Sequence, residues 1–117
     1  MTTITHADIG DRLRRIVISG RLDTPGFESI ASQLDNLMMA PKKGVVVDLC
    51  AIDFLSSTGI GALISHAKAL KAHGGRLVLV VGDSAGVMMS LKNCGVDQLI
   101  PVFRSAADAE RAALVDV

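Results

Sequence analysis

Aromatic residues are scarce in this chain of 117 residues, which contains three Phe and neither Trp nor Tyr. Its core must therefore be built from Val, Ile, Leu, Ala and Met. The scarcity also removes the aromatic platforms on which nucleic-acid-binding proteins stack bases. Twelve basic and twelve acidic residues cancel and are dispersed along the chain, so there is no basic patch of the kind that contacts nucleic acid or a membrane surface. We expect no nucleic-acid partner.

Long apolar runs, secretory signals and cysteine motifs are missing as well. No apolar stretch approaches the roughly 18 to 20 residues needed to cross a bilayer. The first residues lack the basic start and apolar segment of a signal peptide. Cys50 and Cys94 form no metal-binding or redox motif, and we expect them to be reduced, half-buried thiols. These absences predict one cytoplasmic domain over residues 1–117 that does not insert directly into a membrane.

Apolar residues follow a pattern that alternates between strand and helix periodicity. The unbroken apolar runs at 45–49 and 77–81 are typical of strands covered on both faces of a parallel sheet. Further strands are expected at 2–7, 13–19 and 98–102. The predicted order is β-β-α-β-α-β-α-β-α. It indicates an α/β fold with a mixed, mainly parallel β-sheet of about five strands and about four helices packed against it.

Capping residues predict where the four helices begin. Thr24 is a good N-cap, and Pro25 suits the first helical position of the first helix. If the second helix starts at Thr58, Ser57 is its N-cap. Ser84 and Ser105 are the expected N-caps of the third and fourth helices.

Two patterns invite an enzymatic interpretation, and both fail. The segment 82–86, GDSAG, matches the G-x-S-x-G nucleophile elbow, in which the acid and the histidine follow the serine. Here His6, His66 and His73 all precede Ser84, so Ser84 is better explained as a capping residue. His66 and His73 lie two helical turns apart, which is too far for one metal ion without further ligands. No glycine pattern resembles a nucleotide-binding loop. We predict no enzymatic activity, no cofactor and no metal.

The joint between the third strand and the second helix is unusual because it places three hydroxyl residues, 56–58, in a row before Gly59. One capping residue is enough for a helix. A helix N-terminus also favours a phosphate, and a phosphoserine would add about −1.5 to −2 charge there. Gly59 and Gly61 leave backbone open to close approach by another protein. From the residues alone, a plain cap and a phosphate acceptor both remain open.

Three segments, ISGRLDTPGFESI, VVVDLCAIDFLSSTGIGAL and GGRLVLVV, resemble the STAS domain of bacterial anti-sigma-factor antagonists. Members of that family carry a G-x-L-D segment after the second strand and a D-S-[ST]-G-[LI]-G joint before the second helix. The resemblance extends over essentially the whole chain. Ser56 stands where the family usually has the aspartate of the joint.

The resemblance implies a mechanism of partner switching. Ser57 matches the serine that the family's partner phosphorylates, and Asp23 matches an acidic residue beside it. The unphosphorylated protein would bind an ATP-binding, kinase-like anti-sigma factor and so release the sigma factor. The kinase would inactivate it by phosphorylation, and a PP2C-type phosphatase would restore it. The implied partner-binding residues are Arg21, Asp23, Thr24, Ser56, Thr58, Gly59 and Ile60.

A second function for the same fold stays open. A STAS domain can serve as an adaptor subunit of a membrane assembly, such as a lipid-transport ATPase, without being phosphorylated. Ser56 in the aspartate position fits this alternative slightly better than it fits the first.

Overall fold

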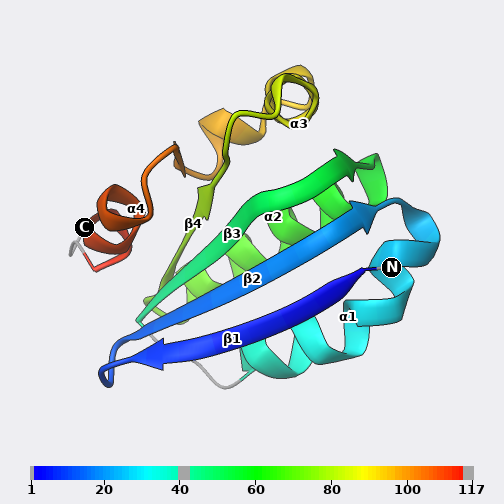
Figure 1. Cartoon of the computed structure of the whole chain (residues 1–117). Coiled ribbons are helices and arrows are strands. Elements are labelled where there is room, and N and C mark those ends of the chain that lie inside the picture. Colours follow the sequence, from blue (N-terminus) through cyan, green and yellow to red (C-terminus); the bar gives the residue numbers. More distant parts are fainter. Residues whose placement is uncertain (1, 40–42, 115–117) are drawn as a thin grey trace.

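The computed structural model describes residues 2–39 and 43–114. Figure 1 shows strands and helices that alternate along most of the chain. The strands are β1 (Thr3–Ile9), β2 (Leu13–Leu22), β3 (Gly44–Leu55), β4 (Arg76–Val80) and β5 (Val102–Phe103). The helices are α1 (Thr24–Met39), α2 (Ser57–Ala72), α3 (Ala85–Asn93) and α4 (Ala106–Ala113), with a short 3-10 helix, η1 (Val96–Gln98), after α3.

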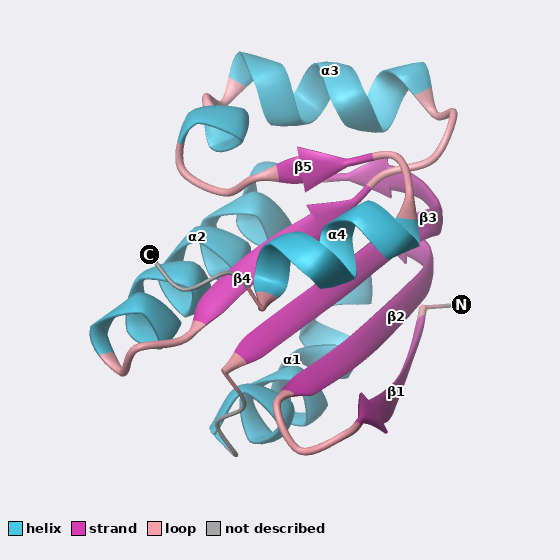
Figure 2. Cartoon of the chain, turned by 90° about the vertical axis from the view of Figure 1, so that its left-hand side faces the viewer, coloured by secondary structure: helices cyan, strands magenta, loops and turns pink. Residues whose placement is uncertain are grey.

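The strands form one sheet in the order β1-β2-β3-β4-β5. β1 and β2 pair antiparallel, and every later pair is parallel. This arrangement confirms the predicted mixed, mainly parallel sheet. Because β2, β3 and β4 run parallel, their carboxyl ends lie at the same edge of the sheet, which Figure 2 shows from the side.

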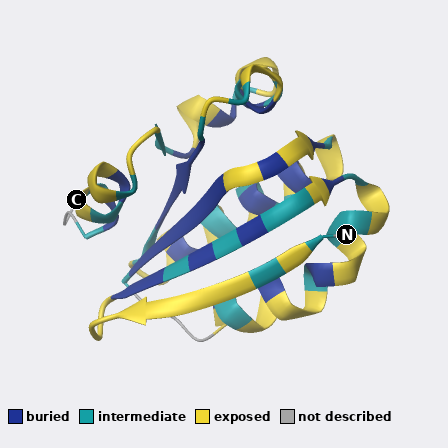
Figure 3. Cartoon of the chain, viewed as in Figure 1, coloured by how far each residue is buried: buried dark blue, intermediate teal, exposed yellow. Residues whose placement is uncertain are grey.

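The two faces of the sheet are covered differently. The larger core cluster joins one face to α1 and α2 through side chains such as Ile16, Leu34 and Leu63. On the opposite face, Val46 and Val78 pack in a smaller cluster with the alanines of α4, and Figure 1 shows α4 on that side. β1 is the most exposed strand (Figure 3). The unbroken runs in β3 and β4 are buried on both sides, as the sequence predicts.

The strand predicted at 98–102 is wrong. Gly95 adopts a left-handed conformation with φ 71°, and the chain then turns through η1. The carbonyl of Val96 accepts hydrogen bonds from the amides of Leu99 and Ile100, at 2.9 and 2.8 Å. These bonds hold the segment in a turn, so β5 begins only at Val102 and is two residues long.

The predicted helix starts are off by one residue in two of four helices. α1 begins at Thr24, and the preceding Asp23 accepts a hydrogen bond from the Gly26 amide at 2.8 Å. Thr24 is therefore the first helical residue and not the cap. α2 begins at Ser57, one residue before the predicted start. Ser84 and Ser105 cap α3 and α4 as predicted.

Both cysteines are free and exposed, so the expectation of half-buried thiols is wrong. β3 continues to Leu55, which places Cys50 within the strand and not at its end. Cys50 is the first exposed residue after the continuously buried part of β3, residues 44–49. Cys94 is the C-cap of α3.

Candidate functional site

The candidate site lies where β2 and β3 end and α1 and α2 begin. Leu22 and Leu55 are paired at the ends of these two strands. The Ser56 amide donates to the Leu22 carbonyl at 2.8 Å. This bond ties the chain entering α2 to the end of β2, so the hydroxyl joint is part of the sheet edge and not a free loop.

Ser56, and not Ser57, is the N-cap of α2. Its backbone is extended, with φ −84° and ψ 163°, and its hydroxyl accepts from the Gly59 amide at 3.3 Å. The Ser56 carbonyl accepts from the Ile60 amide at 3.0 Å. The predicted cap role of Ser57 is therefore wrong, because the preceding serine takes it. Ser57 is the exposed first residue of the helix.

The rest of the joint divides between surface and core. Thr58 is exposed, whereas Gly59 is buried and Ile60 is only 4% exposed. A Cβ added at Gly59 would lie 3.2 Å from Cδ1 of Leu55, which shows how closely the first turn of α2 approaches the end of β3. The side chain of Ile60 packs in the core, so the expectation that it contacts a partner does not match its position in this structure.

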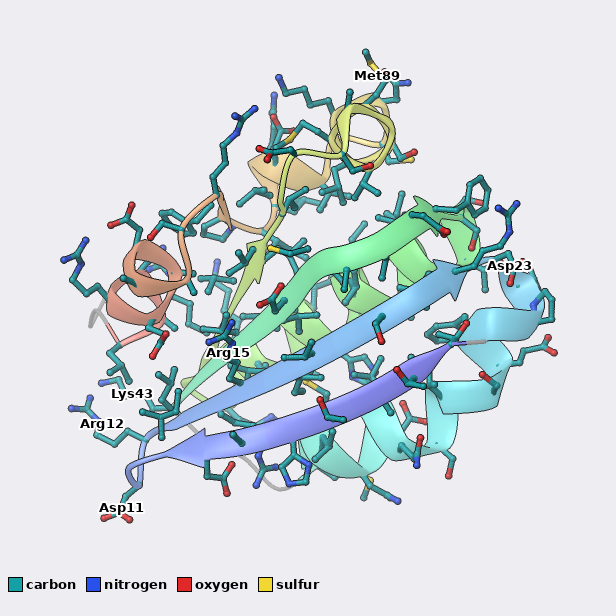
Figure 4. All side chains as sticks on the ribbon, in the orientation of Figure 1. Asp11, Arg12, Arg15, Asp23, Lys43 and Met89 are labelled. Carbon is teal, nitrogen blue, oxygen red and sulfur yellow. The ribbon has the colours of Figure 1, made fainter. Side chains whose placement is uncertain are left out.

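Asp23 occupies the equivalent position at the start of α1. One carboxylate oxygen accepts from the Gly26 amide at 2.8 Å, and the other accepts from Nε of Arg21 at 2.9 Å. The Gly26 hydrogen bond, reinforced by Arg21, holds the pKa of Asp23 below its ordinary value, although partial desolvation opposes the shift. Asp23 is therefore an anion at neutral pH. Figure 4 shows it beyond the end of β2.

Arg21 and Phe54 extend this surface across the ends of the two strands. The two residues are paired in the sheet, and the Arg21 guanidinium lies 4.3 Å from the centre of the Phe54 ring. Phe54, which is 39% exposed, is not among the residues predicted from the sequence. Its signal was available, because an aromatic residue two positions before the hydroxyl joint stands out in a chain with three Phe.

The two helix starts approach each other through threonines. The hydroxyls of Thr24 and Thr58 lie 3.4 Å apart. A Cβ at Gly26 would lie 2.0 Å from the Arg21 carbonyl oxygen, so no larger residue fits in the first turn of α1 without movement of the backbone. The structure therefore brings six of the eight predicted residues to one exposed or half-exposed edge: Arg21, Asp23, Thr24, Ser56, Ser57 and Thr58.

On the sheet face that carries α4, Arg15 and Asp48 form an ion pair of 2.7 Å. Burial tends to raise the pKa of Asp48, but hydrogen bonds from Arg15 and from the Cys50 amide together lower it. Although Cys50 is exposed at the surface, partial desolvation of its thiol and the neighbouring Asp48 raise the pKa of that thiol to about 11. Cys50 is therefore protonated at neutral pH and is a poor nucleophile.

The histidines do not assemble a metal site. His66 of α2 lies 3.1 Å from the carboxylate of Asp35 in α1, and Nδ1 of His73 is 2.8 Å from the Ala69 carbonyl. Within residues 2–39 and 43–114, no group of three or more His, Cys, Asp or Glu side chains is placed to hold a metal ion. In the same ranges, no helix has both the length and the apolar character required to cross a membrane.

Solved structures with the same fold are known. A crystal structure of an anti-sigma factor antagonist from Mycobacterium paratuberculosis superposes with a TM-score of 0.88 at 19% identity, over 97% of this chain and 94% of that one. The anti-sigma factor antagonist SpoIIAA in its unphosphorylated form has a TM-score of 0.76 at 16% identity, over 98% and 100%. The Bacillus cell fate determinant SpoIIAA in the phosphorylated form has a TM-score of 0.68 at 16% identity, over 94% and 99%.

Curated protein sequences give no significant match to this chain. At these identities, the structural likeness establishes the fold. The model of the STAS domain family matches residues 6–109, which is most of the chain. This protein belongs to the STAS domain family.

Proposed function

We propose that this protein is an anti-sigma-factor antagonist that works in the cytoplasm by partner switching and is not itself an enzyme. The observation that carries the proposal is the position of Ser57. It is an exposed hydroxyl at the first residue of α2, and the capping bond of that helix is made by Ser56 instead. A hydroxyl that the fold does not use is free to be modified.

A phosphate on Ser57 suits its surroundings in two ways. The first turn of a helix carries unsatisfied N–H groups and the positive end of the helix dipole, both of which favour an anion. Because Ser56 keeps the cap, modification of Ser57 leaves the Ser56–Gly59 hydrogen bond in place. The phosphate therefore changes the charge of the surface without requiring α2 to unwind.

Ser56 also accounts for the departure from the family joint. Asp and Ser are comparably good N-caps, and Ser56 accepts the hydrogen bond that an aspartate cap would accept. The replacement removes one negative charge next to the acceptor but retains the local backbone. Ser56 was the main sequence feature in favour of the adaptor role. Because Ser56 retains the cap, the joint favours the antagonist role over the adaptor role.

In the proposed cycle, the partner is a kinase-like anti-sigma factor that binds ATP. The Ser57 hydroxyl oxygen attacks the γ-phosphorus, the bond from that phosphorus to ADP breaks, and the hydroxyl proton passes to a base of the partner. A PP2C-type phosphatase reverses the modification by adding water across the new O–P bond, which releases inorganic phosphate. Asp23 lies at the same edge and is ionised, so its charge opposes that of the phosphate and turns it outward.

The surface proposed for the partner consists of Arg21, Asp23, Thr24, Ser57 and Thr58, with Phe54 as its apolar element. Arginine and phenylalanine are both enriched in protein interfaces, and arginine is frequent among the residues that contribute most to binding energy. Gly59 and Ile60 support this surface from beneath.

The test is phosphorylation of matched variants in cells that express the protein natively. Peptide mass spectrometry of the wild type is expected to find phosphate on Ser57. Ser57→Ala is expected to abolish it, whereas Thr58→Ala keeps it. Ser56→Ala is a control for the cap. A wild type that carries no phosphate under any growth condition would reject partner switching and favour the adaptor role.

A further inference from the structure

A groove with a volume of about 710 Å³ lies at the opposite end of α2 from Ser57. We propose that this groove binds a small organic anion with an apolar body. Its walls come from the C-terminal end of α2, the start of β4, the connection between η1 and β5, and the end of α4. From Ser57 to Lys71, α2 rises by about 21 Å, so the groove is separate from the candidate site.

The groove exists because β5 is too short to cover β4. β5 pairs only with Leu79 and Val80, so the first three residues of β4 have no strand neighbour on that side. The Arg76 amide donates to the Lys43 carbonyl on the β3 side, and the Leu79 amide donates to the Pro101 carbonyl on the β5 side. Because strand amides alternate in direction, the Leu77 amide points away from β3 and toward the groove.

The charged residues that line the groove favour an anion. Lys43, Lys71 and Arg76 contribute three positive charges, and Asp97 contributes one negative charge. Lys43 has an interaction of its own, so the charges that bear on a ligand are those of Lys71, Arg76 and Asp97. Because the whole chain has a formal net charge of zero, these three residues are a local excess of one positive charge. Among the described ion pairs, none involves Lys71 or Arg76. Both cations are therefore placed to pair with a ligand.

The remaining lining is apolar. Leu77 and Ile100 are 3% and 1% exposed and form part of the core, whereas Leu99 at the margin is 59% exposed. Ala67 of α2 leaves room above them because its side chain is small. Leu99 offers the exposed apolar surface, next to the buried Leu77 and Ile100, that an alkyl chain covers favourably, at about 0.8 kcal/mol per buried CH₂.

Size and chemistry together define the ligand class. Small-molecule sites usually have volumes of about 300–1,000 Å³, with apolar walls and a few polar groups that fix orientation. A carboxylate pairs with Lys71 and Arg76 and accepts from the Leu77 amide. Its alkyl chain lies over Leu99 and Ile100. Decanoate has both parts and is the probe we choose.

The experiment is an NMR titration of the ¹⁵N-labelled full chain with decanoate below its micellar concentration. We expect saturable shifts at residues 71–77 and 97–101. Decanol lacks the charge and acetate lacks the apolar body, and each is expected to bind at least about tenfold more weakly. Shifts that centre elsewhere, or equal binding of decanol and decanoate, would overturn the proposal.

Charge variants test the same point independently. The double variant Lys71→Gln/Arg76→Gln is expected to weaken decanoate binding roughly tenfold, and Asp97→Asn to strengthen it a few-fold because it removes the opposing charge. Lys68→Gln is the matched control, since Lys68 is exposed on the same helix but does not line the groove. Melting temperatures confirm that each variant is folded. If Lys68→Gln weakened the binding of decanoate as much as the double variant does, the result would contradict a defined site. None of these measurements involves a protein partner, so their failure leaves the function proposed for Ser57 unaffected.

Discussion

The N-termini of α2 and α3 are built alike, but only one of them carries an unused hydroxyl. Each helix follows a parallel strand, and each is capped by a serine that accepts from the amide three residues later at 3.3 Å. After Ser56 the chain continues with Ser57 and Thr58, whereas after Ser84 it continues with alanine and glycine. A capped helix start is therefore common to both, and only the start of α2 offers a second hydroxyl to an enzyme.

The surroundings of the two starts differ as well. At α2, the hydroxyl of Thr58 approaches that of Thr24, and the Arg21–Phe54 pair lies at the ends of the adjoining strands. The α3 start follows Gly82, where an added Cβ would lie 3.5 Å from Cβ of Cys50. The α2 start thus combines charge, an aromatic ring and hydroxyls on one edge, which a partner is able to recognise.

The largest expected effect is on binding to the kinase-like partner that we propose. Ser57→Asp is expected to weaken binding by roughly 30-fold to several thousand-fold, because a charge introduced into a polar interface typically costs about 2–5 kcal/mol. Ser57→Ala is expected to bind nearly as well as the wild type. Calorimetric titration against the purified partner measures both affinities.

Ala85→Asp is the matched control, since it places the same charge at the first residue of α3. It is expected to leave partner affinity unchanged. Equal affinities for Ser57→Asp and the wild type would place the α2 start outside the interface. An equal loss in Ala85→Asp would show that general charge repulsion, and not contact at Ser57, governs binding.

The sequence was sufficient to predict the sheet and the place of the hydroxyl joint between β3 and α2, because both signals are local. The β-branched runs of β3 and β4 have no alternation, which required burial on both faces, and the joint residues were selected from their chemistry. The cap of α2 was predicted one residue late because adjacent serines are equally good caps. The choice between them depends on the bond from the Ser56 amide to the Leu22 carbonyl, a contact across 34 residues.

Two other features depend on tertiary contacts in the same way. Ile60 comes two residues after the joint and was grouped with it, but the helical turn directs it into the core. Arg21 and Phe54 are far apart in sequence and meet only because the register of β2 and β3 shifts before they pair. Periodicity does not reveal such a shift, so the aromatic part of the surface was missed.

The next largest expected effect is the loss of stability when a capping serine is removed, which tests whether the caps of α2 and α3 are equivalent. Ser56→Ala and Ser84→Ala each remove one capping bond and are expected to destabilise the protein by about 1 kcal/mol. Ser57→Ala is expected to cost less than about 0.5 kcal/mol, as an exposed substitution without a structural role. Denaturant unfolding measures all three. A cost for Ser57→Ala as large as that for Ser56→Ala would assign the cap to Ser57 after all.

A smaller effect concerns glycines near the starts of the two helices. Added Cβ atoms at Gly61 and Gly86 would meet nothing within 4 Å. Replacing either by alanine is therefore expected to stabilise the protein by about 0.5–1 kcal/mol through helix propensity. Chemical denaturation measures the stabilities of the two variants. Titration with the partner then shows whether the two substitutions differ in their effect on binding. Gly61→Ala is expected to weaken binding because it thickens the α2 surface, and Gly86→Ala is not. If neither weakens binding, the partner does not approach the α2 backbone closely.

The smallest effect is on the stability of the aspartate variants themselves. Ser57→Asp and Ala85→Asp each place an anion in the first turn of a helix, where the dipole stabilises it by about 0.3–1 kcal/mol at an exposed position. The same interaction lowers the pKa of the introduced carboxyl in the folded state. The gain is therefore present above the unfolded pKa of about 4 and is lost as the pH falls through the folded value. High salt is expected to reduce it as well. Thermal unfolding at pH 7 and pH 3, at low and high salt, measures these differences against the wild type.

A similar small gain in both variants would show that the two helix starts are electrostatically equivalent, and that their difference lies in what the surface presents to a partner. A marked loss of stability in Ser57→Asp alone would instead show that the α2 start does not accommodate the charge of a phosphate, and phosphorylation could not then act without disturbing the fold.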